Sequence, residues 1–318
     1  MPARVKRSAR PAKPAPARSI NDVVPELARR FLVAPEPPTR LPTVRQLARE
    51  HRSSLASIHA AIGRLEGAGA IEVDRRGRLG AFLVKRGVGP LWTAAMGGPL
   101  VVSLPLASSL RYEALATAIK QLLSGAGLEV FLIFVRGSRQ RLDAVRDGRC
   151  HLAAMSRFAA SEVCGPGERV VLELAPNSYN SGHRVLLSTT RTGHRRHRVI
   201  VDRHSADQQL LTALEFAGRD VEFVPAMTAQ ITRLLTAGQA DAAVWTADEM
   251  QAAHPDGIRD RPMSPAVRHR IGDSDTIAVL VGRASDEDVL RTVMAGIDPA
   301  EVARIQAEVM TGKMVPEY

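Results

Sequence analysis

The sequence predicts a multidomain protein in which a small, mainly helical N-terminal module precedes a larger α/β region. Residues 1–90 of the 318-residue chain carry 18 Lys and Arg against 7 Asp and Glu, whereas the remainder is balanced, with 25 against 26. Apolar residues first recur at helical spacing and later fall into short runs that alternate with helical segments. The excess positive charge therefore lies in one module, an arrangement typical of a chain that binds a polyanion with one domain.

The first 18 residues predict a disordered basic tail. They hold six basic and no acidic residues, with repeated Pro and Ala, and this composition cannot bury an apolar face. They lack the apolar core of a secretory signal, and no apolar run of about eighteen residues occurs that could span a membrane. Cys150 and Cys164 have no metal-ligand spacing and fit reduced thiols. We therefore expect a cytoplasmic protein with no membrane partner.

Residues 19–86 predict a winged helix-turn-helix, which is mainly α with a β wing. Ser19, Thr43 and Ser54 are each suited to cap a helix, and each precedes apolar residues at helical spacing. Prolines end the first helix, and a Gly-Ala-Gly group ends the third. Two apolar segments then flank the turn Arg75–Arg78, which predicts a hairpin.

The side chains of this module favour binding to double-stranded DNA. The exposed face of the third helix offers small or hydrogen-bonding groups that can enter a major groove. Arginines around a glycine at the hairpin tip suit phosphates and the minor groove, and free N–H groups at helix starts suit phosphates. The alternative is a small packing or dimerisation domain with solvated arginines. The predicted DNA contacts are Thr43, Arg45, Ser54, Ser57, His59, Arg64, Arg75, Arg76, Gly77 and Arg78.

After a linker predicted at residues 87–98, residues 99–318 predict a two-lobed α/β domain. Buried apolar strands alternate with helices there, as in parallel α/β units. Residues 145–155 and 234–244 share the same order of helix end, glycine and buried strand. Two similar lobes predict a hinged clamp that closes on a small molecule.

The predicted effector site lies at the carboxyl ends of the strands, where open α/β sheets bind ligands. Ser and Arg side chains follow the first three strands, so hydroxyls, free N–H groups and arginines gather at one sheet edge. This chemistry suits a small anionic metabolite; the alternative for each residue is ordinary helix capping with surface charge. The candidates are Ser108, Ser109, Arg111, Arg136, Gly137, Ser138, Ser156, Arg157, Ser178, Tyr179, Trp245 and Thr246.

The sequence offers no catalytic or metal-binding set. His194, His197 and His204 lie among arginines, and that much positive charge opposes a cation. No nucleophile elbow, phosphate-binding loop or complete dinucleotide motif occurs, so we expect neither a cofactor nor enzyme activity. A DNA-binding regulator with a small-molecule sensor is the expected function. The alternatives are a solute-binding protein and a small-molecule enzyme on the same bilobed fold.

Residues 41–48 and 58–71 make the N-terminal module resemble the GntR-type DNA-binding domain. The resemblance implies a homodimer that reads a two-fold operator. The turn residues Arg52 and Ser53, and Leu55 after the helix cap, depart from the family pattern and leave the base preference open.

Residues 238–245 resemble part of the type 2 periplasmic-binding-protein fold, which regulators also use as an effector sensor. Residues 98–100, 104–106, 111–117 and 135–138 resemble the YhfZ-type transcriptional regulators. In that family a GntR-like winged helix precedes this sensor domain. The resemblance covers most of the chain and implies transcription regulation, but it does not supply the natural effector.

Overall fold

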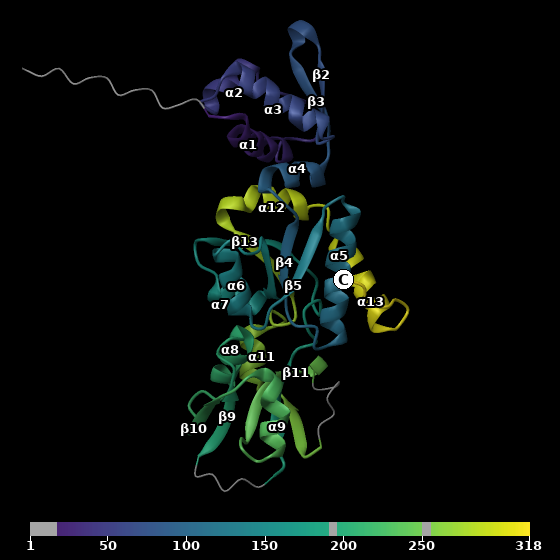
Figure 1. Cartoon of the computed structure of the whole chain (residues 1–318). Helices are drawn as coiled ribbons and strands as arrows, with labels where there is room; N and C mark the ends of the chain where they lie inside the picture. The colour runs from purple at the N-terminus through teal and green to yellow at the C-terminus, as the bar shows by residue number, and fades with distance from the viewer. Residues whose placement is uncertain (1–17, 191–195, 250–255) are drawn as a thin grey trace, which may run out of the picture. The chain divides into compact units, whose positions relative to one another are not determined.

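The computed structural model describes residues 18–190, 196–249 and 256–318. They belong to two compact units, Met1–Gly97 and Gly98–Tyr318, whose helices and strands are labelled in Figure 1. The tail predicted for residues 1–18 lies outside the described residues except at its end. Arg18 itself is held in the first unit, where its Nη1 lies 2.5 Å from Oε1 of Glu26.

In its described part, the first unit consists of helices and a three-stranded antiparallel sheet in the order β1-β3-β2. Two helices begin at the expected caps: Thr43 Oγ1 accepts a hydrogen bond from Gln46 N at 3.2 Å, and Ser54 Oγ accepts one from Ser57 N at 3.0 Å. The elements are α1 Ile20–Leu32, β1 Thr39–Arg40, α2 Val44–Glu50, α3 Leu55–Gly67, β2 Ile71–Arg75, the 3₁₀ turn η1 Gly77–Leu79, β3 Ala81–Arg86 and α4 Val88–Met96.

Helix α4 corrects the prediction of a linker at residues 87–98. Leu91 and Trp92 are fully buried, and α4 packs against α1 inside the first unit. A short helix over residues 91–96 is compatible with the predicted linker, but α4 buries its apolar side chains in the first unit and so belongs to that unit. The boundary between the two units lies at Gly97 and Gly98.

The second unit consists of two lobes, each built on a five-stranded sheet, which confirms the predicted two-lobed α/β fold (Figure 1). The first lobe has the strand order β5-β4-β6-β13-β7, with β4 parallel to β5 and β6. Its elements are β4 Leu100–Leu104, α5 Leu110–Gly125, β5 Val130–Phe134, α6 Ser138–Arg146, β6 Leu152–Ser156, α7 Arg157–Val163, β7 Glu168–Glu173, β13 Ala278–Arg283, η3 Ala284–Asp286, α12 Glu287–Met294 and α13 Pro299–Met310.

The second lobe repeats this pattern with the order β10-β9-β11-β8-β12, in which β9 is parallel to β10 and β11. Its described elements are β8 His183–Ser188, β9 His197–Val201, α8 Ala206–Glu215, β10 Val221–Pro225, η2 Thr228–Gln230, α9 Ile231–Thr236, β11 Ala242–Thr246, β12 Ile258–Pro262 and α11 Pro265–Ile271.

The chain crosses between the lobes after β7 and returns after α11. The two crossing segments run side by side, because Tyr179 N donates to Thr276 O at 2.8 Å and the Asn180 side chain donates to Asp275 O at 3.0 Å. Each crossing delivers a strand that enters its sheet antiparallel: β8 beside β11 and β13 beside β6. The paired crossings give the second unit the two-segment connection of a hinged clamp.

Each lobe has an apolar cluster, and each cluster takes in a buried residue from the opposite lobe: Ala206 in the first and Phe158 in the second. In the first lobe, Val145, Met155 and Val279 are fully buried in one cluster. In the second lobe, Val199 and Val244 are fully buried in another. No helix in the described part of the chain is long and apolar enough to cross a membrane.

Candidate ligand-binding site between the lobes

A cavity of about 370 Å³ lies between the two lobes of the second unit. Several of its residues follow the carboxyl ends of β4, β5, β9 and β11, the edge at which the sequence predicts a ligand. It is lined from the first lobe and first crossing segment by Pro105, Leu106, Ser108, Tyr112, Arg136, Gly137, Ser138, Arg141, Tyr179 and Asn180. From the second lobe it is lined by His183, Asp202, Ser205, Asp207, Gln208, Thr228, Ala229, Trp245, Thr246 and Glu249.

Contacts around this cavity hold the two lobes together. Arg136 Nη2 donates to both carboxylate oxygens of Asp202, at 2.8 and 3.0 Å. Ser138 Oγ, at the start of α6, accepts from Ala206 N at 3.0 Å and so caps the first turn of α8 from the opposite lobe. The structure therefore shows the clamp with its lobes in direct contact.

Gly137 allows the closest of these approaches. Its φ is +79°, a value that favours glycine, and a Cβ built on it would overlap the backbone oxygen of His204 in the opposite lobe. A side chain at this position would be disfavoured twice: the backbone conformation is unfavourable for any residue other than glycine, and the added Cβ would clash with a backbone atom that cannot move away.

We expect Gly137→Ala to destabilise the closed arrangement of the lobes. The positive φ alone disfavours alanine by about 1–2 kcal/mol, and the overlap with His204 adds roughly another 1–3 kcal/mol. Gly127→Ala is the matched control, because Gly127 has a φ of +81° but no atom within 4 Å of the added Cβ. Urea unfolding of both variants measures the difference; equal loss of stability in the two would show that the contact with His204 is unimportant.

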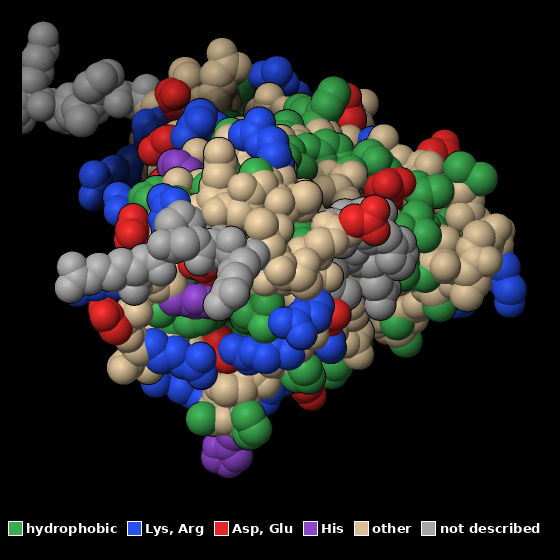
Figure 2. Space-filling model, turned by 90° about the horizontal axis from the view of Figure 1, so that it is seen from below, with side chains coloured by type: hydrophobic (Ala, Val, Ile, Leu, Met, Phe, Trp, Pro, Cys, Tyr) green, Lys and Arg blue, Asp and Glu red, His purple; other side chains and the backbone are tan. Residues whose placement is uncertain are grey.

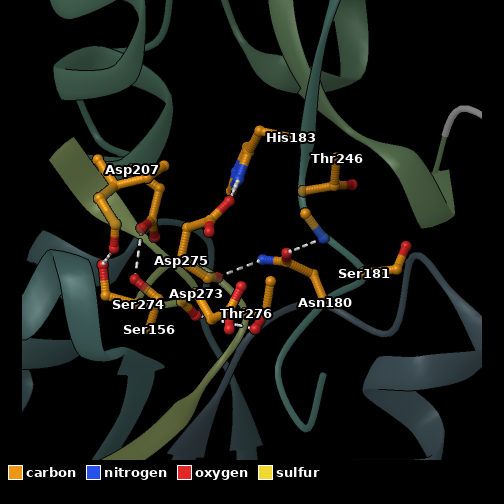
Figure 3. Close-up of polar contacts among 12 residues, drawn as sticks. Ser156, Asn180, Ser181, His183, Asp207, Thr246, Asp273, Ser274, Asp275 and Thr276 are labelled. Atoms are coloured by element: carbon orange, nitrogen blue, oxygen red, sulfur yellow. Dashed lines mark hydrogen bonds and ion pairs between the residues drawn. The ribbon is translucent and has the colours of Figure 1, made fainter. Parts of the chain in front are cut away.

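A buried charged pair lies beside the cavity, between the two crossing segments (Figure 3). His183 Nδ1 is 2.8 Å from Oδ2 of Asp275, and the Asp275 side chain is fully buried. Burial alone lowers the pKa of His183, but the hydrogen bond and charge of Asp275 outweigh it, so the pKa is raised. Burial alone raises the pKa of Asp275, but the hydrogen bond and charge of His183 outweigh burial, so the pKa of Asp275 is lowered. Both directions favour a charged imidazolium–carboxylate pair.

Asp207 is a second buried carboxyl group at the cavity. It is 5% exposed, and its Oδ1 accepts from the hydroxyl of Ser156 in the first lobe, as Figure 3 shows. Burial raises the pKa of Asp207, although His183 and the Ser156 hydrogen bond act in the opposite direction. Its other oxygen has no hydrogen-bond partner among the described residues. The ionised form of Asp207 is therefore poorly compensated by protein groups alone.

Arg141 supplies the buried positive charge of the cavity wall. Its side chain is 3% exposed and donates to Ala154 O, Val135 O and the Tyr179 hydroxyl, each at 2.8 Å. Burial raises the pKa of Tyr179 to about 12, so its hydroxyl is neutral at pH 7. Arg141 thereby ties α6 to β6 and to the first crossing segment.

Two hydrogen-bond donors at the cavity are left unused. The indole Nε1 of Trp245 and the Nε of Arg136 are both buried and have no partner in the described part of the chain. Both residues line the cavity. Buried donors without partners are rare in folded proteins, and at a cavity they mark places where a ligand acceptor fits.

The structure gathers part of the predicted effector site in this cavity. Ser108, Arg136, Gly137, Ser138, Tyr179, Trp245 and Thr246 line it. The other candidates have structural contacts elsewhere: Ser109 caps α5, Arg111 pairs with Asp248 at 3.0 Å, Ser156 caps α7 and binds Asp207, Arg157 pairs with Glu173 at 2.9 Å, and Ser178 Oγ accepts from Ala278 N.

Sequence reasoning missed the carboxylates and most of the buried polar groups of the site. Arg141, His183, Asp202, Asp207 and Glu249 stand in no motif, and each is brought to the cavity by packing between distant segments. One available signal was the amphipathic pattern of the helices after β5 and β9, which places Arg141 and Asp207 on buried faces.

The predicted DNA contacts lie in the first unit. Some are already hydrogen-bonded or ion-paired within the protein, and others are exposed without a partner among the described residues. Thr43 and Ser54 cap helices, and Ser57 Oγ lies 2.9 Å from Ser54 Oγ. Arg64 donates to Asn21 at 3.0 Å, Arg75 pairs with Glu66 at 2.6 Å, and Arg76 pairs with Asp74 at 2.7 Å. Arg45, His59 and Arg78 are exposed and have no partner among the described residues, and Gly77, also exposed, adopts a φ of +55°.

The histidines considered for a metal do not form a cluster in the described part of the chain. His194 lies outside the described residues, His197 is half exposed on β9, and the His204 ring lies 3.3 Å from the Gln140 amide nitrogen. Lys and Arg side chains are mixed with acidic ones on the face shown in Figure 2. Arg196, for example, pairs with Asp220 and Arg261 with Glu215, which agrees with the balanced charge of the second unit.

The fold and the cavity define a class: a two-lobed α/β domain with a ligand-sized cavity between its lobes, preceded in the chain by a small, mainly helical unit. The model of the YhfZ C-terminal domain matches residues 88–318. The chain is also 30% identical over 297 residues to YhfZ of Escherichia coli (strain K12), a match that covers 93% of this chain and 96% of that protein. The chain belongs to the YhfZ family.

Solved structures also resemble part of the chain. The crystal structure of YhfZ from Shigella flexneri has 27% sequence identity and a TM-score of 0.57, and the match covers 69% of this chain and 93% of that one. A periplasmic substrate-binding protein of an ABC transporter from Coxiella burnetii matches with 17% identity and a TM-score of 0.44, over 69% of this chain and 100% of that one.

Proposed function

We propose that the protein is a DNA-binding transcriptional regulator whose second unit senses a small molecule. The order of α1, α2 and α3 followed by the β2–β3 hairpin fits a winged helix-turn-helix of the GntR-like type. The observation that carries the proposal is the presence of three exposed arginines, Arg45 on α2, Arg52 in the α2–α3 turn and Arg78 at the hairpin tip, that have no carboxylate partner among the described residues.

In this proposal α3 enters the major groove and the hairpin lies over the adjacent backbone. The exposed residues near the start of α3 include Leu55 and His59, which can contact base edges and thymine methyl groups. Arg75 and Arg76 already bind Glu66 and Asp74, so Arg78 is the tip arginine that is ready to contact DNA. Arg45, in the first turn of α2, is placed for a phosphate.

We expect Arg78→Ala and Arg45→Ala to weaken DNA binding, each with a salt slope reduced by about 1 if the contact is to phosphate. The measurement is fluorescence anisotropy of the full chain with duplexes from upstream of its own gene and with a random duplex of equal length. Arg304→Ala, an exposed change on α13 where Arg304 pairs with Glu301 and Glu308, is the control for net charge. Equal weakening by Arg304→Ala, or no preference of the wild type over random DNA, would contradict the proposal.

The second unit would couple ligand binding to DNA binding. We propose a cytoplasmic homodimer, without cofactor or enzymatic activity, in which an effector stabilises lobe closure and changes the spacing of paired DNA-binding units. Operator affinity measured with and without saturating effector tests this coupling, and identical affinities would exclude it.

A solute-binding protein is the second candidate, and the cavity favours it as much as it favours a sensor. The two functions share the ligand site and differ in the first unit. Specific, salt-dependent DNA retention is expected of the regulator alone. Tight ligand binding without any DNA preference would assign the protein to the solute-binding class.

A further inference from the structure

Two hydrogen-bond donors at the interlobe cavity have no acceptor, and they indicate where the acceptor groups of a ligand would lie. Trp245 Nε1 and Arg136 Nε are buried at the cavity wall with no acceptor among the described residues. The two donors come from opposite lobes, since Arg136 follows β5 and Trp245 lies in β11. A ligand that satisfies both must offer oxygen acceptors, and a carboxylate has enough lone pairs to accept from both lobes at once.

Two carboxylates at the same cavity offer hydrogen-bond acceptors to the ligand. Asp207 uses one carboxylate oxygen for Ser156 and has no described partner for the other. Among the described residues, the partners of Glu249 are the hydroxyls of Ser108 and Thr246. Neither carboxylate has an ion-pair partner in the part of the chain that the structure describes, although both line the cavity. Asp207, which is buried, and Glu249, which is partly exposed, therefore offer carboxylate oxygens to a positively charged hydrogen-bond donor of the ligand.

The charges of the neighbouring groups exclude a ligand with a large net negative charge. Arg136 is already neutralised by Asp202, Arg111 by Asp248, and His183 by Asp275. Among the described residues of the wall, Arg141 is the remaining cation, whereas Asp207 and Glu249 are two carboxylates without an ion-pair partner. An anionic metabolite would add negative charge to a cavity wall in which negative charge is already in excess. A ligand with separate positive and negative groups would match the wall.

Part of the cavity wall is apolar, which favours a ligand with an apolar group between its polar ends. Tyr112 and Tyr179 are buried and meet edge to face, with ring centroids 5.3 Å apart. Together with Pro105, Leu106 and the Trp245 ring they give the cavity an apolar side. Such surfaces bind aliphatic or aromatic groups between the polar ends of a ligand.

We propose that the cavity binds a small zwitterion of the α-amino-acid class, with its ammonium at Asp207 and Glu249 and its carboxylate at Arg136 Nε and Trp245 Nε1. This assignment rests on the part of the proposed function in which the second unit binds a small molecule, and it replaces the anionic metabolite expected from the sequence. It does not depend on DNA binding.

The first experiment is a thermal shift of the full chain with each of the twenty standard L-amino acids at millimolar concentration, followed by titration calorimetry of the best probe. Matched analogues of that probe, one without the ammonium and one without the carboxylate, are then compared with it. The expected result is at least about tenfold weaker binding of each analogue, because each leaves charged or polar groups of the wall unpaired. No binding of any amino acid, or equal binding of either analogue, would overturn the proposal.

Variants test the two ends separately. Trp245→Phe removes the Nε1 donor and keeps an aromatic, though smaller, side chain, so we expect the amino acid to lose more affinity than its analogue without a carboxylate. Glu249→Gln should weaken the amino acid and spare the analogue without an ammonium, and it changes a residue that is not fully buried. Unchanged selectivity in both variants would contradict the assignment. DNA anisotropy on the same samples separates the outcomes: DNA binding without amino-acid binding defeats the zwitterion alone, and the reverse defeats the regulator alone.

Discussion

Replacing His183 with alanine is expected to lower the free energy of unfolding of the second unit by about 3–5 kcal/mol, the usual effect of removing one member of a buried ion pair. The Asp275 side chain is fully buried, so His183→Ala leaves its charge without the imidazolium 2.8 Å away. Arg268 lies 3.6 Å from the other carboxylate oxygen and offers partial compensation. Urea unfolding gives the free energies. His197→Ala is the control, because His197 is half exposed on strand β9 of the same sheet.

The double variant His183→Ala, Asp275→Ala shows whether the pair itself is responsible. Removing both partners takes away the buried unpaired charge, so the double variant should be more stable than the sum of the two single losses predicts. Additive losses would mean that packing around the crossing segments, rather than the charge pair, accounts for the effect of His183→Ala.

The same pair should make stability depend on pH in two directions. The pKa of His183 is raised above 6.5 in the folded protein, so its contribution is complete below 6.5 and is lost as pH rises through the folded value. The pKa of Asp275 is lowered from 3.8, so its contribution is present above 3.8 and is lost as pH falls through the folded value. Unfolding free energies measured from acid to alkaline pH should show these changes in the wild type and lack the alkaline one in His183→Ala.

The elements that the sequence predicts best are those encoded locally. The cap at Thr43 and the apolar run before Ser156 each lie within a few residues of the structure they determine. The sequence does not predict where β8 and β13 join their sheets, because each enters its sheet from the other side of a crossing and this pairing depends on residues far away in the chain.

The same distinction explains the candidate site. The sequence places Arg136 after a strand, and the structure agrees, but the carboxylate that neutralises it comes from position 202 in the other lobe. The sequence therefore suggests a positive pocket where the folded protein has paired charges. Helical spacing places Asp207 and Arg141 on buried faces, but the groups that they meet in the cavity are set by tertiary packing between distant segments.

Replacing Trp92 with alanine is expected to lower the free energy of unfolding of the first unit by about 3–5 kcal/mol, because a fully buried large side chain is lost and a cavity remains. Trp92 lies on α4, which packs on α1, so the loss should act on the three-helix region that would bind DNA. Thr93→Ala, an exposed change on the same helix, is the matched control.

Two readouts locate the effect of Trp92→Ala. DNA affinity should fall with the unfolding of the first unit, whereas the urea midpoint of the second unit should not move, because its two cores lie beyond Gly98. If Trp92→Ala left the first unit as stable as Thr93→Ala does, residues 88–96 would behave as the linker that the sequence predicts. If it destabilised the second unit instead, α4 would belong to the domain that the family model begins at residue 88. A loss confined to the first unit is the outcome that the buried position of Trp92 requires.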